Sequence, residues 1–146
     1  GYHLGEHHFW QKSNLHEEVT RVPMIISVPG MKPGRTNSVT ELMDIYPTLS
    51  SLLGIPAPES VQGKNLVPVL KNPGAKVRKA ALSFNRGGHG LRTDRWAYLR
   101  YKNGDDELYD MEKDPKQFTN LAYDPAHNAT KMQLLQRLKE RVEEYQ

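Results

Sequence analysis

The chain has 146 residues, of which 37% are hydrophobic and 25% charged, a length that suits one domain with its own core. Its net charge of +3 is dispersed, so it predicts no nucleic-acid-binding face, and no apolar run is long enough to predict a membrane span. The absence of cysteine excludes disulfides, thiolate catalysis and cysteine-ligated zinc within the chain.

The first twelve residues, GYHLGEHHFWQK, concentrate histidines, aromatic rings, a glutamate and a lysine at a chain end. Chain ends usually fray, so this concentration is unusual. The segment has neither helical nor strand periodicity and predicts a loop. His3 and His7 would share one face of a helix, but Gly5 weakens a helix and the H-E-x-x-H motif is absent. A self-contained zinc site is therefore not expected.

The next elements are predicted from apolar periodicity and turn residues. Residues 15–20 predict a short helix, and the β-rich run at 22–28, closed by Pro29-Gly30, predicts a buried strand. Residues 38–54 give the clearest helix signal, with Gly54 as a natural end. Asp44 is the expected N-cap of this helix.

The second half predicts a small antiparallel sheet with one covering helix, which is an α+β unit. The strands are expected at 80–84, 90–93, 96–101 and 107–110, with turns at Gly87–Gly90 and Asn103–Gly104 and a helix at 127–145. We expect a domain boundary between residues 73 and 74.

Two places could carry chemistry. Lys12 follows Phe9-Trp10, and a cation beside an aromatic surface could hold an oxyanion, although a surface lysine lying on Trp10 would look the same in sequence. His89 lies between glycines and Arg92 follows, so this segment could bind a carboxylate or sulfate group. A plain glycine turn with a surface histidine explains the pattern equally well.

Four stretches of the chain resemble, in order, segments of the sulfatase family. Gly1–His7 with Trp10 and Lys12 resembles the segment that follows a metal-binding Asp-His pair in that family. The other three stretches are Arg21–Gly30, Asp44–Leu49, and Glu107–Asp110 with Asp114-Pro115 and Phe118–Leu121. Within the family, the resemblance is greatest to iduronate-sulfatase-like glycan sulfatases.

The resemblance implies that residues 1–73 are the tail of a large α/β domain with a mixed sheet, and that residues 74–146 are a small antiparallel subdomain ending in a helix. It implies a sulfuric ester hydrolase of the alkaline-phosphatase-like superfamily that uses Ca²⁺ and a formylglycine. Lys12 falls on the catalytic lysine that contacts the sulfate. Substrate contacts are expected from four further residues: Tyr2, His7, His89 and Arg92.

The departures from the family are equally informative. The Asp-His pair would precede Gly1, and neither C-x-P-x-R nor S-x-P-x-R occurs, so no metal ligand is assigned in this chain. We therefore expect a carboxy-terminal fragment that is inactive alone. Its expected partners are the amino-terminal remainder of the enzyme and a sulfated sugar or glycosaminoglycan such as iduronate 2-sulfate, with no nucleic acid and no membrane. The location implied by the family is periplasmic, secreted or lysosomal.

Two alternatives remain open from the sequence. The parent could be a phosphonate or phosphodiester hydrolase of the same superfamily, because such enzymes share these carboxy-terminal patterns. The chain could also be a non-catalytic module that binds anionic glycans.

Overall fold

The structure is a computed structural model that describes residues 1–145 and contains two compact units. One unit comprises Gly1–Met24 and Leu82–Gln146, and the other comprises Ile25–Ala81. The expected boundary between residues 73 and 74 concerns the domains of the parent protein and stays a prediction. No helix within the described residues combines the length and the apolar character needed to cross a membrane.

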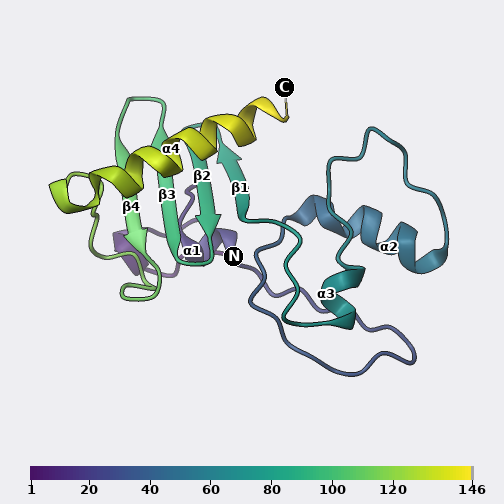
Figure 1. The fold of residues 1–146 in the computed structure, drawn as a ribbon. Coiled ribbons are helices and arrows are strands. Elements are labelled where there is room, and N and C mark those ends of the chain that lie inside the picture. The colour runs from purple at the N-terminus through teal and green to yellow at the C-terminus, as the bar shows by residue number, and fades with distance from the viewer. Residues whose placement is uncertain (146) are drawn as a thin grey trace. The chain divides into compact units, whose positions relative to one another are not determined.

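The first unit is built on a four-stranded sheet in the order β1-β2-β3-β4 (Figure 1). The strands are β1 (Ala80–Asn85), β2 (Gly88–Thr93), β3 (Trp96–Tyr101) and β4 (Asp106–Asp110). β3 pairs antiparallel with both of its neighbours. The helical elements of this unit are η1 (Glu6–His8), α1 (Glu17–Thr20), η3 (Pro125–His127) and α4 (Asn128–Glu143). The predicted antiparallel sheet with a carboxy-terminal helix is therefore confirmed.

One face of the sheet packs against α4. Leu91 is paired across the sheet with Tyr98, and Tyr98 with Leu108, so these three nearly inaccessible side chains share that face. α4 contacts β2 and β3 and buries Leu134 and Leu138 (Figure 1). The amphipathic pattern predicted for the last helix thus provides the helical side of this core.

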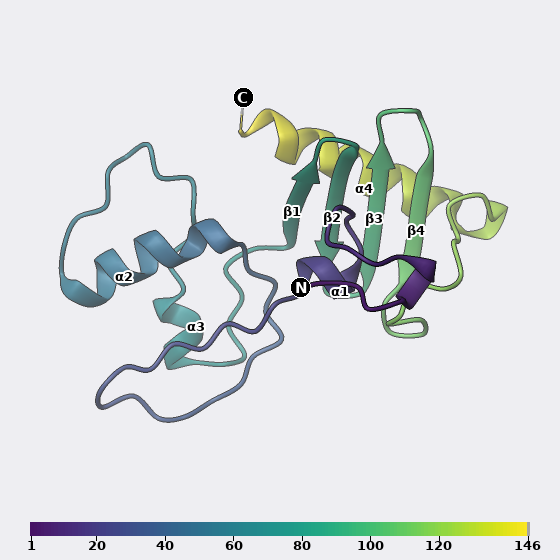
Figure 2. The same cartoon turned by 180° about the vertical axis from the view of Figure 1, so that it is seen from behind.

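The amino-terminal segment covers the opposite face. Figure 2 shows residues 1–20 in front of the strands, on the side away from α4. A second cluster of buried side chains lies here: Leu15, Ala97, Leu99, Tyr109 and Met111, with Tyr101 partly buried beside them. Burial of Leu15 therefore fixes the segment that carries GYHLGEHHFWQK against the sheet.

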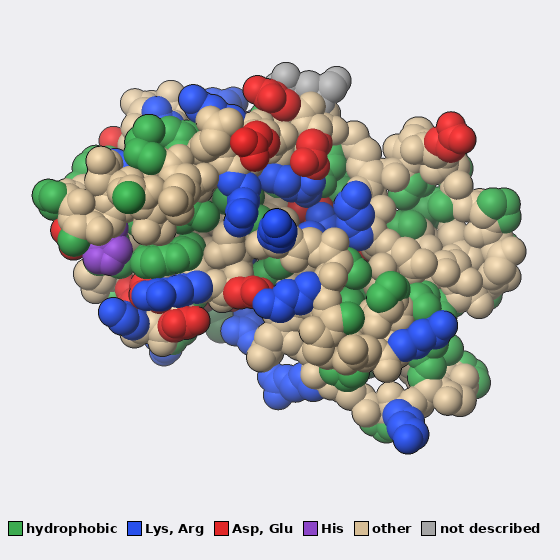
Figure 3. All heavy atoms as spheres, viewed as in Figure 1, with side chains coloured by type: hydrophobic (Ala, Val, Ile, Leu, Met, Phe, Trp, Pro, Cys, Tyr) green, Lys and Arg blue, Asp and Glu red, His purple; other side chains and the backbone are tan. Residues whose placement is uncertain are grey.

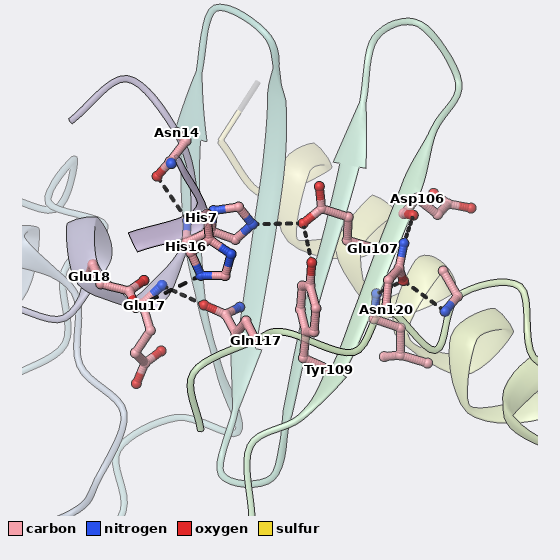
Figure 4. A network of polar contacts seen from close by, with 12 residues as sticks. His7, Asn14, His16, Glu17, Glu18, Asp106, Glu107, Tyr109, Gln117 and Asn120 are labelled. Atoms are coloured by element: carbon pink, nitrogen blue, oxygen red, sulfur yellow. Dashed lines mark hydrogen bonds and ion pairs between the residues drawn. The ribbon is translucent and has the colours of Figure 1, made fainter. Parts of the chain in front are cut away.

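The outer edge of β4 is covered by the segment around Asn120. The Asn120 side chain accepts a hydrogen bond from the Leu108 N–H at 3.0 Å and donates one to the Asp106 carbonyl at 3.1 Å. The Leu121 N–H donates to the Leu108 carbonyl at 2.8 Å. This segment thus takes the place of a fifth strand (Figure 4).

The glycine turn differs from the prediction at Gly87–Gly90. The turn lies at Arg86 and Gly87, and β2 already begins at Gly88. A Cβ at Gly88 would lie 2.3 Å from the Arg100 carbonyl oxygen, so this glycine permits close strand pairing rather than a turn.

The second unit contains η2 (Leu42–Asp44), α2 (Ile45–Leu53) and α3 (Val67–Lys71). Gly54 ends α2 in the left-handed conformation with φ 67°, as its position predicted. The helix expected from residue 38 begins only at Leu42. Asp44 occupies the N-cap of α2, but its buried carboxylate accepts hydrogen bonds from the backbone N–H groups of Glu41 and Lys64 instead of capping α2.

The predicted buried strand at 22–28 is wrong for the described chain. These residues form no strand, and the Ile25 side chain is 90% exposed. A strand needs a hydrogen-bonded neighbour, and residues 1–145 provide none for this segment. The apolar stripe of the neighbouring helix is also uncovered, with Leu42 78% and Leu53 71% exposed, and hydrophobic side chains reach the surface in Figure 3.

Candidate functional site

The first twelve residues form a closed loop. The His3 N–H donates to the Gln11 carbonyl at 2.9 Å, and the Gly5 N–H donates to the Phe9 carbonyl at 3.2 Å. Between these two pairs the chain turns through η1. The loop predicted at this end of the chain is therefore ordered by its own backbone hydrogen bonds.

The tip of the loop needs unusual backbone conformations. Gly5 has φ 120°, and His7 and His8 have φ 55° and 56°. A side chain at Gly5 would be strained at this φ and would also meet the Trp10 indole at 3.4 Å. Non-glycine residues at positive φ cost free energy and often mark functional segments.

Lys12 leaves the loop with an exposed side chain. Among the described residues it makes no hydrogen bond and no ion pair, so its ammonium group is free for an external anion. Tyr2, on the other limb of the loop, is also 53% exposed. The loop therefore presents two predicted site residues at its surface.

Two histidines of the loop, His3 and His7, form a cluster with His16. The His7 and His16 rings stack with centroids 4.5 Å apart and an interplanar angle of 17° (Figure 4). The His3 ring lies edge-on to both, with centroids 5.7 Å and 6.0 Å away, and is fully buried. His7 was predicted to contact substrate, but here its half-buried ring packs within this cluster.

Glu107 on β4 anchors the cluster. Its Oε2 lies 2.8 Å from His16 Nε2 and accepts a hydrogen bond from the Tyr109 hydroxyl at 2.8 Å (Figure 4). Burial raises the pKa of Glu107, but the hydrogen bonds from His16 and from the hydroxyls of Tyr109 and Tyr101 outweigh this effect, so the pKa lies below its ordinary value of 4.5. Glu107 is therefore an ionised anchor at neutral pH.

The cluster does not amount to a metal centre. The Glu18 carboxylate lies 3.9–4.0 Å from His3 and His7, and among residues 1–145 no group of three or more His, Cys, Asp or Glu side chains is arranged to hold a metal ion. The chain also has neither the C-x-P-x-R nor the S-x-P-x-R motif from which a formylglycine could form. The described residues therefore do not by themselves fit a Ca²⁺ ion or a formylglycine.

The remaining predicted site residues lie apart from each other. Arg92 faces the amino-terminal segment, where its Nε lies 3.1 Å from Glu17 Oε2. Its guanidinium is therefore already paired with a carboxylate of the same chain. His89 alternates with Gly90 along β2 and lies on the opposite, α4-covered face together with Leu91. The structure thus brings Tyr2, His7 and Lys12 together in the loop and leaves His89 away from them.

Sequence reasoning missed three residues that hold this loop. His3 was weighed only as a weak zinc ligand, and Asn14 and His16 were not considered. Asn14 bonds the His3 ring, and His16 bonds Glu107, which lies 91 residues later. No local pattern could have indicated the second pair.

A comparison with protein families identifies the chain. The family described as N-sulphoglucosamine sulphohydrolase, C-terminal, matches residues 5–144. The chain belongs to the sulfatase family. This sulfatase chain is 33% identical, over 162 aligned residues, to the N-acetylglucosamine-6-O-sulfatase of Bacteroides thetaiotaomicron, covering 99% of the chain and 29% of that protein.

Solved structures agree with the family assignment. One, a protein in complex with its substrate D-glucosamine-2-N,6-O-disulfate, has a TM-score of 0.83 at 30% identity, covering 99% of this chain and 33% of that one. Another, the phosphonate monoester hydrolase of Agrobacterium radiobacter, has a TM-score of 0.59 at 25% identity and covers 70% of this chain and 25% of that one. The sulfatase chain thus spans a quarter to a third of the length of these relatives.

Proposed function

We propose that the parent of this chain hydrolyses sulfate esters of a sulfated sugar and that Lys12 binds the sulfate group. The proposal is supported chiefly by the structural similarity over 99% of the chain to a protein holding a sulfated glucosamine. It is also supported by the position of Lys12, whose exposed ammonium has no internal partner among the described residues.

Lys12 would act by electrostatics. Its ammonium would hold one sulfate oxygen and stabilise the negative charge on the sulfate oxygens in the transition state. Ca²⁺ and formylglycine, implied by the family, would have to be supplied by residues outside this chain. The chain alone would therefore be inactive.

The names of the relatives support one substrate class for this chain. An N-acetylglucosamine-6-O-sulfatase and a complex with a glucosamine disulfate both support a sulfated glucosamine as the first substrate to test. Iduronate 2-sulfate, within a glycosaminoglycan, is the second substrate to test. The periplasmic, secreted or lysosomal location stays a prediction.

The test compares wild-type parent enzyme with Lys12→Ala by measuring sulfate released from glucosamine 6-sulfate. We expect turnover to fall by about 10²- to 10³-fold, as for loss of one oxyanion-stabilising donor, with unchanged thermal unfolding. Lys32→Ala, at another exposed lysine, is the matched control and should keep full turnover. Undiminished turnover in Lys12→Ala would contradict the proposal.

A phosphonate hydrolase is the second candidate, supported by the similarity to the Agrobacterium enzyme. Faster turnover of a phosphonate monoester than of any sulfate ester would favour it. Binding of a sulfated glycan by the isolated chain, without turnover in the parent, would favour the non-catalytic module.

A further inference from the structure

We propose that His3 is a positioning residue that holds Lys12 in place, acting together with Asn14. This inference rests on the proposed role of Lys12 in sulfate-ester hydrolysis. It follows from contacts that His3 makes on both sides of Lys12 in the sequence.

His3 holds the residues that flank Lys12. Its backbone N–H donates to the carbonyl of Gln11, the residue directly before Lys12, at 2.9 Å. Its ring Nε2 contacts the side-chain amide of Asn14, two residues after Lys12, at 2.9 Å to Nδ2 and 3.2 Å to Oδ1. One residue thus restrains the chain before and after Lys12.

Either tautomer of His3 can form a hydrogen bond with the Asn14 amide. The Asn14 Oδ1 accepts the backbone N–H of His16 at 3.3 Å and can use its second lone pair to accept from a protonated His3 Nε2, whereas Asn14 Nδ2 can donate to an unprotonated Nε2. The other ring nitrogen, Nδ1, is buried and makes no hydrogen bond to the described residues, with the Glu6 carboxylate 3.9 Å away. A glutamine at position 3 carries both an acceptor oxygen and a donor nitrogen, so it could bond the Asn14 amide in either arrangement.

His3 is itself closely packed. Its side chain is fully buried, and its ring is held edge-on by Phe9 at 5.6 Å and by His16 at 6.0 Å between centroids. His16 is in turn bonded to Glu107 on β4. The contacts therefore connect the Lys12 backbone to the rigid sheet.

Lysine needs such support because its long side chain has many rotamers and Lys12 has no internal partner that would select one. Only its backbone can be fixed in advance. A displacement of about 1 Å at a reacting group can cost about 10²-fold in rate.

The test measures sulfate release from glucosamine 6-sulfate by the full-length parent enzyme. His3→Ala and Asn14→Ala should each lower kcat/KM by about 10- to 100-fold, and His3→Gln should restore most of the loss. In a Lys12→Ala background, His3→Ala should cause no further loss, because its effect passes through Lys12. His8→Asn, at an exposed histidine with φ 56° that asparagine tolerates, is the matched control and should keep normal turnover.

A second readout does not depend on turnover. Hydrogen exchange over residues 9–14 should be faster in His3→Ala and Asn14→Ala than in the wild type and His8→Asn. Unchanged exchange there, undiminished kcat/KM in both variants, or an equal loss of rate with and without Lys12 would each overturn the inference. If Lys12→Ala itself keeps full turnover, the proposed function fails, while the exchange result still decides whether His3 holds the Lys12 segment.

Discussion

His16 and Glu107 are 91 residues apart in the sequence, and their side chains meet at 2.8 Å between Nε2 and Oε2. This contact ties the segment that carries Lys12 to β4, a terminal strand of the carboxy-terminal sheet. Tyr109 donates a second hydrogen bond to the same carboxylate oxygen. The sheet therefore supports the loop, in addition to forming its own core.

Glu107→Gln tests this support. Hydrogen bonds to charged groups contribute more than those to neutral ones, so we expect a loss of about 2 kcal/mol in the free energy of unfolding at pH 7. The pKa of Glu107 is lowered in the folded state, so its stabilisation is fully present above 4.5 and is lost as the pH falls through the folded-state pKa.

Chemical unfolding of the protein between pH 3 and 7 checks the effect. The difference between wild type and Glu107→Gln should be largest at neutral pH and shrink below pH 4.5. Glu59→Gln, at an exposed carboxylate, is the control and should follow the wild type throughout. A difference that persists unchanged at pH 3 would contradict an ionised anchor.

Arg78→Ala should strongly destabilise the unit formed by residues 25–81. The Arg78 guanidinium bonds both Glu41 and Asp44, and all three side chains are at most 6% exposed. Removing it leaves two buried carboxylates without their cation, which typically costs about 3–5 kcal/mol. Thermal unfolding measures the loss, and exposed Arg35→Ala should have little effect. Similar unfolding of the two variants would disprove this role of Arg78.

Gly88→Ala should weaken the pairing of β2 with β3. Its new Cβ would lie 2.3 Å from the Arg100 carbonyl oxygen, a backbone atom that can move only with its strand. We expect a loss of about 1–3 kcal/mol, as for overpacking. Gly87→Ala is the neighbouring control, because its Cβ would meet only the Asn85 side chain at 3.3 Å. Equal unfolding midpoints for the two variants would count against this explanation.

Asn120→Ala should loosen the segment beside β4. The side chain makes hydrogen bonds to the backbone of Asp106, Leu108 and Ala122, each contributing about 1 kcal/mol. Hydrogen exchange of the Leu108 and Ala122 amides should become faster. Thr119→Ala, one residue earlier, is the control and should leave both amides protected. Equal protection of these amides in the two variants would contradict the role given to Asn120.

The sheet was largely predictable because its signals are local. β3 lies at the predicted residues 96–101, and the hairpin turn follows at Asn103–Gly104. Both predictions depend on short sequence patterns, because alternating aromatic residues favour a strand and an Asn-Gly pair favours a tight turn within a few residues. The run at 22–28 carried the same kind of signal and failed. Strand formation there depends on a partner that is absent from residues 1–145.

The candidate site was predictable only in part. The resemblance to sulfatases singled out Lys12, but the structure shows that its surroundings depend on long-range pairs such as His16 with Glu107 and Glu17 with Gln117. The prediction for His89 relied on neighbouring glycines, and strand alternation places it on the other face. Sequence spacing cannot reveal pairs that form only when distant segments meet.

The segment that covers β4 closes that edge of the sheet. Asn120 and Leu121 occupy the hydrogen-bonding groups of β4, whereas β1 is the terminal strand at the other side and exposes 75% of Phe84. Unpaired strand edges template the addition of further chains. Addition of a further strand at β4 would therefore first require displacement of the segment around Asn120.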